Sequence, residues 1–400
     1  MRILLHYCRR LVIILFKILL TFLPKNKKLI LFTSWFGEKY ADSSKFEFEY
    51  LLHHSDYEVY WVASKKELYD ELKSRNIPVL YSKSLKGWWM QARAIMLVSS
   101  VQQSDFNPYL YRNCIFFDLD HGFALKEVGF AIPGADKRWI SYNKLLRKGV
   151  QYWMSAPTEW SMDKVRLCYD VSANNIVRCN KPRTDLLFDK NLQSSINQNV
   201  EQIKSDRKAI VWMPTHRSCG EQPIKMSELV DFNKLQTICE ENNVVFLIKK
   251  HFYHKHERED VTAYPNIIDI TNMDVDSTVI LSQADALVSD YSASYIEYLA
   301  LDRPIILYAY DKDEFLAKER GLFIRLEDNT AGEVVENSEA FLNSIKRICD
   351  DWYDTSFAEG RKIARSLYFN DDVKSGEYRK SVKDIIDQLI VGAYKSNWKN

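Results

Sequence analysis

The feature that most constrains this chain is a series of short apolar runs that alternate with helical stretches, and the series occurs twice. The first comprises LILFTSW (29–35), VYWVAS (59–64), VLYS (79–82), AIMLVSS (94–100), CIFFDLD (114–120), YWMSAP (152–157) and NIVRCN (175–180). The second comprises AIVWMPT (209–215), VVFLIKKH (244–251), IIDI (267–270), ALVSDYS (286–292) and PIILYAY (304–310). Continuous apolar runs between helices indicate parallel strands that are covered on both faces. The sequence therefore predicts a doubly wound α/β fold that forms twice.

A polar segment between the two series sets the predicted domain boundary. Residues 189–208 are rich in Asn, Gln and Ser, which is typical of a linker. We expect one Rossmann-like domain at 28–190, a second at 205–370 and a helical tail at 371–400. Two such domains facing a cleft form the GT-B-like architecture. Ligands of open α/β sheets bind beyond the carboxyl ends of the strands, so polar residues just after each strand are the candidates for function.

Composition excludes several classes of protein. Hydrophobic residues make up 46% of the chain and charged residues 27%, which is typical of a folded protein and not of a disordered or polytopic membrane protein. The formal net charge of +1 gives no indication of nucleic-acid binding. The seven cysteines are scattered and never form CxxC, which disfavours disulfides and structural zinc and favours a reducing cytosolic setting. The chain has no G-x-G-x-x-G and no P-loop, which weakens NAD enzymes and P-loop NTPases.

The N-terminal segment concentrates positive charge around an apolar run. Residues 1–28 carry seven Lys or Arg and no acid, and LVIILFKILLTFL occupies residues 11–23. As a helix this run spans about 20 Å, short of the roughly 30 Å hydrocarbon core of a bilayer. We predict that residues 1–27 form a helix lying on an anionic membrane surface, held also by its cations. A buried first helix, a signal peptide and a membrane span are the alternatives, although no A-x-A-like cleavage site follows.

The most informative stretch is ADALVSDYSASYIEYLALDRPIILYAYDKDEF, residues 284–315. A strand is expected to end at Asp290, and a small polar turn containing Ser292 and Ser294 opens a helix. Free backbone N–H groups and hydroxyls at such a helix start form a phosphate site. Glu297 lies one turn inside, where it can hydrogen-bond a ribose or a base. The alternative is an ordinary capping turn with Ser292 or Ser294 as the N-cap.

A second segment, FFDLDHGFALKEVGF, spans residues 116–130 and ends a predicted buried strand. It brings Asp118, Asp120 and His121 to a glycine turn, followed by Lys126. A histidine at the carboxyl end of a strand suits general-base catalysis at neutral pH, and either aspartate can orient its imidazole. The two aspartates also read as D-x-D, a metal–nucleotide motif that is too short to be specific. A structural role for His121 is equally compatible with the spacing.

A third segment, FLIKKHFYHKH (246–256), places His251 after a strand and beside two lysines. Its three histidines match no strong zinc spacing, and neighbouring lysines oppose a cation, so we predict no metal site. A basic phosphate pocket fits better, and a solvated basic strand end is the alternative.

Two shorter segments place further polar residues after strands. KPRTDLLF (181–188) contains Arg183 and Asp185, and MPTHRS (213–218) contains Thr215, His216 and Arg217. Arginine suits bidentate phosphate contacts. Each segment alone fits a surface loop, but the recurrence of polar clusters at strand ends favours a shared site for an anionic ligand.

Taken in order, these motifs resemble one known family. HGFALKEVG, KPRTDLLF, MPTHR, LIKKH and above all SDYSASYIEYLALDRPIILYAYDKDEF followed by ERGLF resemble the CDP-glycerol glycerophosphotransferases, the teichoic-acid primases and polymerases with relatives in capsule synthesis. The similarity covers roughly residues 28–370. It implies a GT-B-like peripheral enzyme at the cytoplasmic face of the membrane. It also implies transfer of a polyol phosphate from a CDP-activated donor to a hydroxyl of a lipid-linked or polymer acceptor, with release of CMP.

The resemblance assigns roles to individual residues. The histidine of its HG-x-x-LK motif falls on His121, and the second essential histidine falls on His251. The donor-phosphate hydroxyls fall on Ser292 and Ser294. Residues predicted to share the donor site are Glu297, Arg217, Thr215 and Asp290. Residues predicted to position the acceptor or a phosphate are Lys126, Arg183, Asp185 and Asp120.

The chain also departs from the family pattern around both histidines. Phe123 and Ala124 stand where the family has Thr-Pro, Phe252 replaces a proline, and His216 replaces a tryptophan. These changes leave the reaction type in place and leave open whether the donor carries glycerol, ribitol or another polyol. Whether a divalent metal assists is also open, and we expect no tightly bound cofactor.

The implied mechanism uses His121 as the base that takes a proton from the acceptor hydroxyl, whose oxygen attacks the β-phosphorus of the donor. His251, Arg217 or Lys126 would stabilise the phosphoryl charge that develops. Two other classes remain open at this stage: a GT-B glycosyltransferase that uses a nucleotide sugar, and a non-catalytic nucleotide-binding relative.

Overall fold

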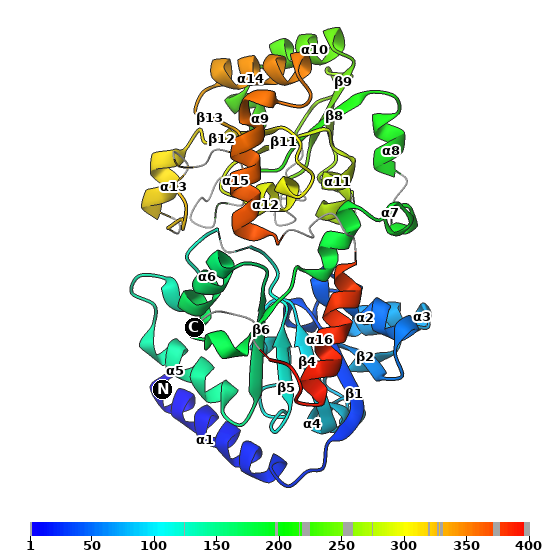
Figure 1. Ribbon diagram of the computed structural model, residues 1–400, viewed down its shortest axis with the longest axis vertical. Coiled ribbons are helices and arrows are strands. Elements are labelled where there is room, and N and C mark those ends of the chain that lie inside the picture. Colours follow the sequence, from blue (N-terminus) through cyan, green and yellow to red (C-terminus); the bar gives the residue numbers. More distant parts are fainter. Residues whose placement is uncertain are drawn as a thin grey trace. The chain divides into compact units, whose positions relative to one another are not determined.

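The computed structural model, drawn in Figure 1, forms two compact units. Unit 1 comprises residues 1–122, 129–185 and 377–400, and unit 2 comprises residues 123–128 and 186–376. The structure describes residues 2–123, 125–196, 199–215, 217, 225–250, 259–273, 275–318, 321–325, 328, 331–370 and 377–395.

Unit 1 is built on a seven-stranded parallel sheet with the order β3-β2-β1-β4-β5-β6-β7. Its strands are β1 (Asn26–Thr33), β2 (Glu58–Ala63), β3 (Val79–Tyr81), β4 (Ala94–Ser99), β5 (Ile115–Asp118), β6 (Gln151–Ala156) and β7 (Ile176–Arg178). Its helices are α1 (Arg2–Leu20), α2 (Asp42–His54), α3 (Lys66–Ser74), α4 (Leu85–Arg93), α5 (Lys137–Arg147), α6 (Glu159–Tyr169) and α16 (Tyr378–Ile390).

Unit 2 is built on a six-stranded parallel sheet with the order β10-β9-β8-β11-β12-β13. Its strands are β8 (Lys208–Trp212), β9 (Val244–Ile248), β10 (Ile267–Asp269), β11 (Ala286–Ser289), β12 (Ile305–Tyr308) and β13 (Glu333–Val335). Its helices are α7 (Lys190–Ile196), α8 (Asn199–Lys204), α9 (Met226–Leu229), α10 (Phe232–Glu241), α11 (Ser277–Gln283), α12 (Ser294–Leu299), α13 (Lys312–Lys318), α14 (Ser338–Asp350) and α15 (Ala358–Tyr368).

The predicted α/β class with two parallel sheets is confirmed, and all twelve predicted strands are present. The sequence did not predict β13, which is three residues long and only partly buried, so it leaves no continuous apolar run. The predicted strands also ran too far at their carboxyl ends. For example, β5 ends at Asp118, which leaves Asp120 and His121 in the loop beyond the ladder.

Alternate residues of the central strands fill two separate cores in unit 1. Ile30 and Phe32 of β1 pack into one cluster, whereas Leu29 and Leu31 pack into the cluster on the other face. This alternation is the period of two that a strand imposes on its side chains. It explains why the strands read as continuous apolar runs: both faces of the sheet are covered.

The C-terminal segment returns to unit 1. Helix α16 contributes Val382 and Ile386 to the same core cluster as Phe48 and Leu51 of α2. Contact with α2 thus places residues 377–400 with unit 1, whereas the sequence suggested a separate tail at 371–400. Nothing in the local pattern of α16 indicates which unit it joins, because its partner helix lies more than 300 residues earlier in the chain.

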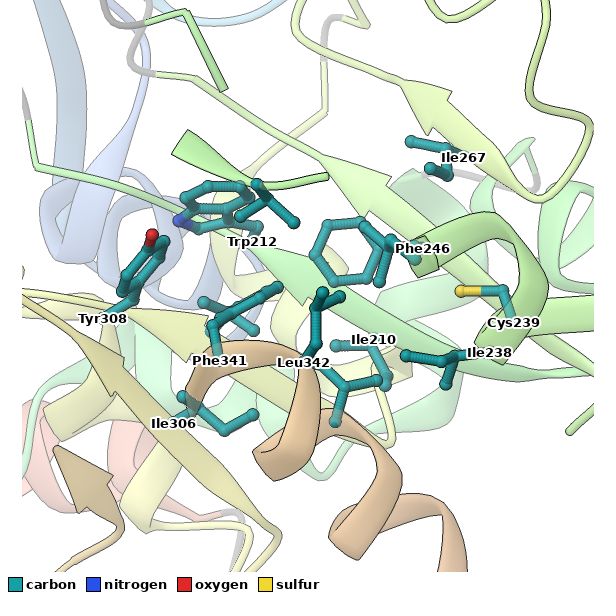
Figure 2. Close-up of a cluster of buried hydrophobic side chains, with 14 of the residues drawn as sticks. Ile210, Trp212, Ile238, Cys239, Phe246, Ile267, Ile306, Tyr308, Phe341 and Leu342 are labelled. Carbon is teal, nitrogen blue, oxygen red and sulfur yellow. The ribbon is translucent and has the colours of Figure 1, made fainter. Parts of the chain in front are cut away.

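The core of unit 2 is shown in Figure 2. Trp212 of β8 contacts the rings of Phe246, Tyr308 and Phe341, which come from β9, β12 and α14. Each fully buried large apolar side chain contributes about 1.5–3 kcal/mol of transfer free energy. This cluster fixes β8 in the sheet, and the loop that follows β8 carries part of the candidate site.

Helix α1 packs one face on unit 1 and leaves another exposed (Figure 1). Ile13 is buried against Leu145 and Leu146 of α5. Lys17 is 3% exposed, and its ammonium donates to the carbonyl oxygens of Leu146 (2.8 Å), Lys148 (3.2 Å) and Tyr111 (3.3 Å). Burial lowers the pKa of Lys17 to about 8. The sequence counted Lys17 among the cations facing lipid; the structure corrects this, because Lys17 holds α1 onto the end of α5.

The exposed face of α1 is apolar. Leu15, Ile18 and Leu19 are between 52% and 69% exposed, at helical spacing, and Phe22 in the turn after α1 is 83% exposed. Within the described residues, no helix has both the length and the apolar character that a membrane crossing requires.

Candidate functional site

In each sheet the direction of the strand connections reverses at one place. The reversal lies between β1 and β4 in unit 1 and between β8 and β11 in unit 2. Ligands of open α/β sheets bind beyond the carboxyl ends of strands at such reversals. The residues after β1, β4 and β5 form the first candidate edge, and those after β8, β11 and β12 form the second.

At the unit 1 edge, β5 ends in a buried carboxyl group. Asp118 is 1% exposed; it accepts hydrogen bonds from the Tyr152 hydroxyl (2.8 Å) and from the backbone N–H of Asp120 (3.0 Å). Burial raises the pKa of Asp118 to about 7, and the charge of Asp120 adds to the effect. Its partners turn Asp118 toward β6, which leaves Asp120 as the aspartate beside the predicted base.

His121 follows as an accessible side chain. Its imidazole is 44% exposed, and its Nδ1 lies 3.6 Å from a carboxylate oxygen of Asp120. The other carboxylate oxygen of Asp120 lies 3.6 Å from the ammonium of Lys181, which also donates to the Leu119 carbonyl. Asp120 adopts a left-handed φ of 56°, and the backbone N–H of His121 donates to its carboxylate. This loop therefore presents an accessible imidazole next to a carboxylate that can stabilise its protonated form.

Trp35 belongs to this edge, although no motif in the sequence predicted it. Its ring lies 5.5 Å from the imidazole of His121, at an interplanar angle of 62°. Its position directly after the first strand was the available signal, because residues that follow β1 lie at the reversal of the sheet. A half-buried tryptophan alone reads as ordinary packing.

Arg183 and Asp185 have partners within unit 1 that the sequence did not reveal. Arg183 forms an ion pair with Asp42, the first residue of α2. Asp185 is fully buried and accepts from the backbone N–H groups of Tyr378 (2.9 Å) and Arg379 (3.1 Å), so it caps α16. Burial raises the pKa of Asp185 despite these donors. Both residues hold elements of unit 1 together, and their predicted role in positioning the acceptor or a phosphate stays a prediction.

At the unit 2 edge, the turn after β11 carries two partly exposed hydroxyls. The Oγ atoms of Ser292 and Ser294 lie 3.0 Å apart, and the backbone N–H of Ser294 donates to Ser292 Oγ at 3.2 Å. The N-cap of α12 is Ala293, which makes no side-chain capping hydrogen bond, so the cap at Ser292 or Ser294 that was weighed from the sequence is not formed. Partial exposure of both serines leaves their hydroxyls able to donate to a ligand.

Behind this turn lies a buried ion cluster. Asp290 is 1% exposed; it accepts from the backbone N–H and hydroxyl of Thr215 and from Arg217 (2.9 Å). Arg217 also donates two hydrogen bonds to Asp311, at 2.7 and 3.0 Å. Burial opposes its charge, but the two carboxylates prevail and raise the pKa of Arg217. Arg217 thus clamps the ends of β8, β11 and β12 together, and the phosphate contact that the sequence suggested for it stays a prediction.

Lys126 lies in the same cluster of unit 2. The rings of Tyr291 and Phe315 stack 3.8 Å apart, with Arg217 5.1 Å and Lys126 5.4 Å from the centroid of Phe315. Cations over aromatic faces are stabilised by the ring quadrupole. Residues 125–127 are held by an antiparallel bridge between Lys126 and Leu322.

Gly321 of the ERGLF motif lies next to this bridge. The backbone N–H of Glu127 donates to the Gly321 carbonyl at 2.9 Å. A Cβ at residue 321 would lie 2.5 Å from a carboxylate oxygen of Glu127, so a larger residue there would displace the end of that side chain.

The remaining predicted residues are either buried or outside the described part of the chain. Glu297 is 6% exposed and accepts from the Thr278 hydroxyl at 3.2 Å, inside unit 2. Lys250 pairs with Glu259 at 2.7 Å, and Lys249 donates to backbone carbonyls after β10, so both lysines have internal partners. His251 and His216 lie outside the described residues. Within the described residues no group of three His, Cys, Asp or Glu side chains gathers in a metal-binding arrangement.

The two parallel sheets carry polar residues at the strand ends, where open α/β sheets bind ligands, and comparison with known proteins identifies the family. Residues 15–386 match the family model described as CDP-Glycerol:Poly(glycerophosphate) glycerophosphotransferase, so the chain belongs to that family. The family and enzyme class predicted from the sequence are confirmed: the chain is a glycerophosphotransferase-type transferase.

The names of individual relatives agree with this family. The chain is 27% identical over 365 residues to the teichoic acid glycerol-phosphate transferase of Staphylococcus aureus (strain NCTC 8325 / PS 47), covering 86% of this chain and 89% of the relative. It is 26% identical over 279 residues to the ribitol-phosphate polymerase TarL of the same strain, covering 65% of this chain and 46% of that one. A solved structure of the wall teichoic acid polymerase TagF superposes with a TM-score of 0.75 at 19% identity, covering 97% and 98% of the two chains, which shows a shared fold.

Proposed function

We propose that this transferase moves glycerol phosphate from CDP-glycerol to a hydroxyl group of a lipid-linked or polymer acceptor and releases CMP. The observation that carries the proposal is that one family match runs through both units, and that an accessible histidine with an adjacent carboxylate follows β5 within it. Glycerol phosphate is favoured over ribitol phosphate because the relative that matches over most of its length is a glycerol-phosphate transferase.

The chemistry assigned to unit 1 is proton transfer. His121 accepts the proton of the acceptor hydroxyl while that oxygen bonds to the β-phosphorus of the donor. The bond from this phosphorus to the bridging oxygen breaks, and the electron pair leaves with CMP. Asp120, 3.6 Å from the ring, stabilises the imidazolium that forms. A positioned general base typically contributes 10²- to 10⁴-fold to the rate.

The chemistry assigned to unit 2 is donor binding. The hydroxyls of Ser292 and Ser294 donate to the pyrophosphate, and Lys126 supplies positive charge in the same unit. Arg217, Asp290 and Thr215 fix the loop that carries these groups. His251 is proposed to stabilise the phosphoryl oxygens, as the family resemblance implies, and the cleft arrangement of the two sheets remains a prediction.

The first experiment measures CMP release from CDP-glycerol and, separately, CDP-ribitol, with membranes as the acceptor source. We expect CMP from CDP-glycerol, and a loss of about 10²- to 10⁴-fold in His121→Ala. His54→Ala is the matched control, because His54 is an exposed histidine of unit 1 at the far end of α2. Wild-type turnover in His121→Ala would remove His121 from the mechanism.

The same assay tests the competing donors. CMP from CDP-ribitol alone would reassign the polyol. Release of a nucleoside diphosphate from a nucleotide sugar, without CMP from either CDP-polyol, would favour the glycosyltransferase alternative. Donor binding without release of any product would indicate a non-catalytic relative.

We further propose that unit 1 associates with the membrane surface, at the cytoplasmic face, through α1 and α4. The exposed apolar face of α1 supports this, and α4 exposes Trp88 (46%) and Trp89 (53%). The chain after α1 is tied to α4, since Lys25 donates to the Ala92 carbonyl at 2.7 Å. Tryptophan is enriched at membrane–water interfaces, and basic residues are attracted to anionic lipid.

Leu19→Glu tests this association because Leu19 is 69% exposed and its loss opens no cavity. We expect sedimentation with phosphatidylglycerol vesicles to weaken by at least about tenfold, since each buried leucine contributes about 1.5–3 kcal/mol. Turnover of soluble acceptor analogues should persist. Leu167→Glu on α6, 56% exposed, is the matched control. Equal sedimentation of Leu19→Glu and wild type would exclude this face of α1 as the anchor.

A further inference from the structure

Two consecutive residues after β1 adopt a strained backbone. Trp35 and Phe36 have φ values of 49° and 59°, in the left-handed region that favours glycine. Asp42, at the start of α2, has a φ of 64°. Such conformations are unfavourable for residues other than glycine and persist where the surroundings enforce them, often at functional sites. Three of them within eight residues, beside the loop that carries His121, call for a physical explanation.

Backbone contacts hold the turn in this conformation. The N–H of Phe36 donates to a carboxylate oxygen of Asp105 at 3.0 Å, and the Gly37 carbonyl accepts from the N–H of Ser64 at 2.7 Å. The ring of Phe36 is 48% exposed, so the packing of this side chain stabilises the strained backbone only weakly. The conformation therefore serves the placement of its neighbour, Trp35.

Trp35 is fixed at its polar end. Its indole N–H donates to one carboxylate oxygen of Asp42, and Arg183 pairs with the other. Asp42 is 4% exposed and Arg183 is 15% exposed, so this ion pair is shielded from water. A hydrogen bond to a charged group is stronger than one between neutral groups, so this contact holds the indole in one orientation.

The ring of Trp35 contacts His121, the proposed base. Its ring lies edge-to-face with the imidazole of His121, at 5.5 Å. Asp120 does not fix the ring by a hydrogen bond, because its carboxylate lies 3.6 Å from Nδ1. Within the described residues, the hydrogen bond of His121 at this loop is made by its backbone N–H and not by its ring nitrogens. The edge-to-face contact with Trp35 is therefore the aromatic contact that restrains the orientation of the imidazole.

We propose that Trp35 is a positioning residue for His121, and that Asp42 and Arg183 act by holding Trp35. The proposal rests on the proposed function of His121 as the base. It gives Arg183 a role in the reaction through Asp42 and Trp35, with no contact to a phosphate. A base held in the productive orientation matters because misplacement of about 1 Å can cost 10²-fold in rate.

The test separates kcat from KM in three variants. Trp35→Ala removes the ring, Trp35→Phe keeps a ring but loses the N–H, and Asp42→Asn keeps an acceptor but loses the charge that pairs with Arg183. We expect kcat to fall by about 10²-fold in Trp35→Ala and by less in the other two, with the KM for CDP-glycerol unchanged. Trp139→Phe on α5, which removes an indole 40% exposed elsewhere in unit 1, should behave as wild type.

A double variant decides whether the effect passes through His121. If Trp35 acts by placing the imidazole, Trp35→Ala should cause no further loss in a His121→Ala background, where residual CMP release is followed at high enzyme concentration. Residues that act as a unit show this non-additivity. Equal additional loss in both backgrounds, or a matching rise in KM, would overturn the proposal and leave Trp35 a structural residue.

A measurement without turnover covers the case in which residual activity is too low to follow. In wild-type protein labelled with ¹³C-histidine, the ring signals of His121 are assigned by their loss in His121→Ala. Trp35→Phe should shift these signals and leave those of His54 in place, because the ring against the imidazole changes. Unshifted His121 signals would also overturn the proposal. Wild-type turnover in His121→Ala would instead refute the proposed base, whatever Trp35 does.

Discussion

The two sheet edges occupy equivalent places in their units, but their carboxyl groups have different kinds of partner. At the unit 2 edge, Asp290 and Asp311 share the guanidinium of Arg217. At the unit 1 edge, Asp105 and Asp118 are held by hydroxyl and backbone donors, and burial raises their pKa values to about 6 and about 7. A charge-paired cluster gives a rigid support for a bound anion. Uncharged donors offset the cost of burying a carboxylate less than a shared cation does, which is why the pKa values of Asp105 and Asp118 are raised.

Removing the clamp of unit 2 should have the largest effect on stability. Arg217→Ala leaves two buried carboxylates without their shared cation, and breaking a buried pair in this way costs about 3–5 kcal/mol. Hydrogen exchange read by mass spectrometry should show faster exchange in peptides from β8 and β11, with unit 1 peptides unchanged.

The matched control for the clamp is Arg325→Ala, which breaks an exposed pair with Asp328 and should change little. If Arg217→Ala leaves exchange in β8 and β11 at the wild-type rate, Arg217 is not the clamp and becomes available as a phosphate ligand.

We expect the free energy of unfolding of unit 1 to depend on pH through Asp118. Asp118 keeps its proton up to a pH of about 7 in the folded state, whereas an aspartate in the unfolded chain has an ordinary pKa of 3.8. Between these values the folded state binds more protons, so the free energy of unfolding falls as pH rises. The loss from this one group is about 2–4 kcal/mol.

Asp118→Asn should remove that dependence while keeping hydrogen bonds to Tyr152 and to the backbone of Asp120. Urea midpoints of unit 1 peptides at pH 5 and pH 8 should lie closer together in Asp118→Asn than in wild type. Asp163→Asn, at an exposed aspartate of α6, is the control. An unchanged difference between the two pH values would show that Asp118 is ionised throughout.

The smallest expected effect is at the donor hydroxyls. Ser292→Ala and Ser294→Ala each remove one hydrogen bond to the donor phosphate, worth about 1.5 kcal/mol. The KM for CDP-glycerol should rise by about tenfold in each, with kcat nearly unchanged. Ser366→Ala, at an exposed serine of α15, serves as the control. A wild-type KM in both variants would leave the two serines of the turn after β11 with their mutual hydrogen bonds alone.

The sequence predicted what depends on local pattern. Strands were found because both faces of each sheet are covered. His121, Ser292 and Ser294 were predicted as site residues because polar residues directly follow apolar runs, and the structure places all three at the carboxyl ends of strands. The partners of Arg217 and Asp185 could not be found this way: Asp311 lies 94 residues from Arg217, and Tyr378 lies 193 residues from Asp185. Trp35 was missed because an aromatic residue after a strand reads as packing until its contact with His121 is seen.

The return of α16 to unit 1 also affects the order in which the chain can fold during synthesis. Unit 2 is encoded between residues 186 and 376, before the helix that completes the core of unit 1. At about 5–20 residues per second, α16 follows residue 185 off the ribosome by roughly 10–40 s. For that interval the apolar face of α2 is uncovered. Limited proteolysis of stalled nascent chains should find unit 1 cleavable until residues 378–390 have emerged. Unit 1 is therefore the first unit to begin translation and the second to complete its core.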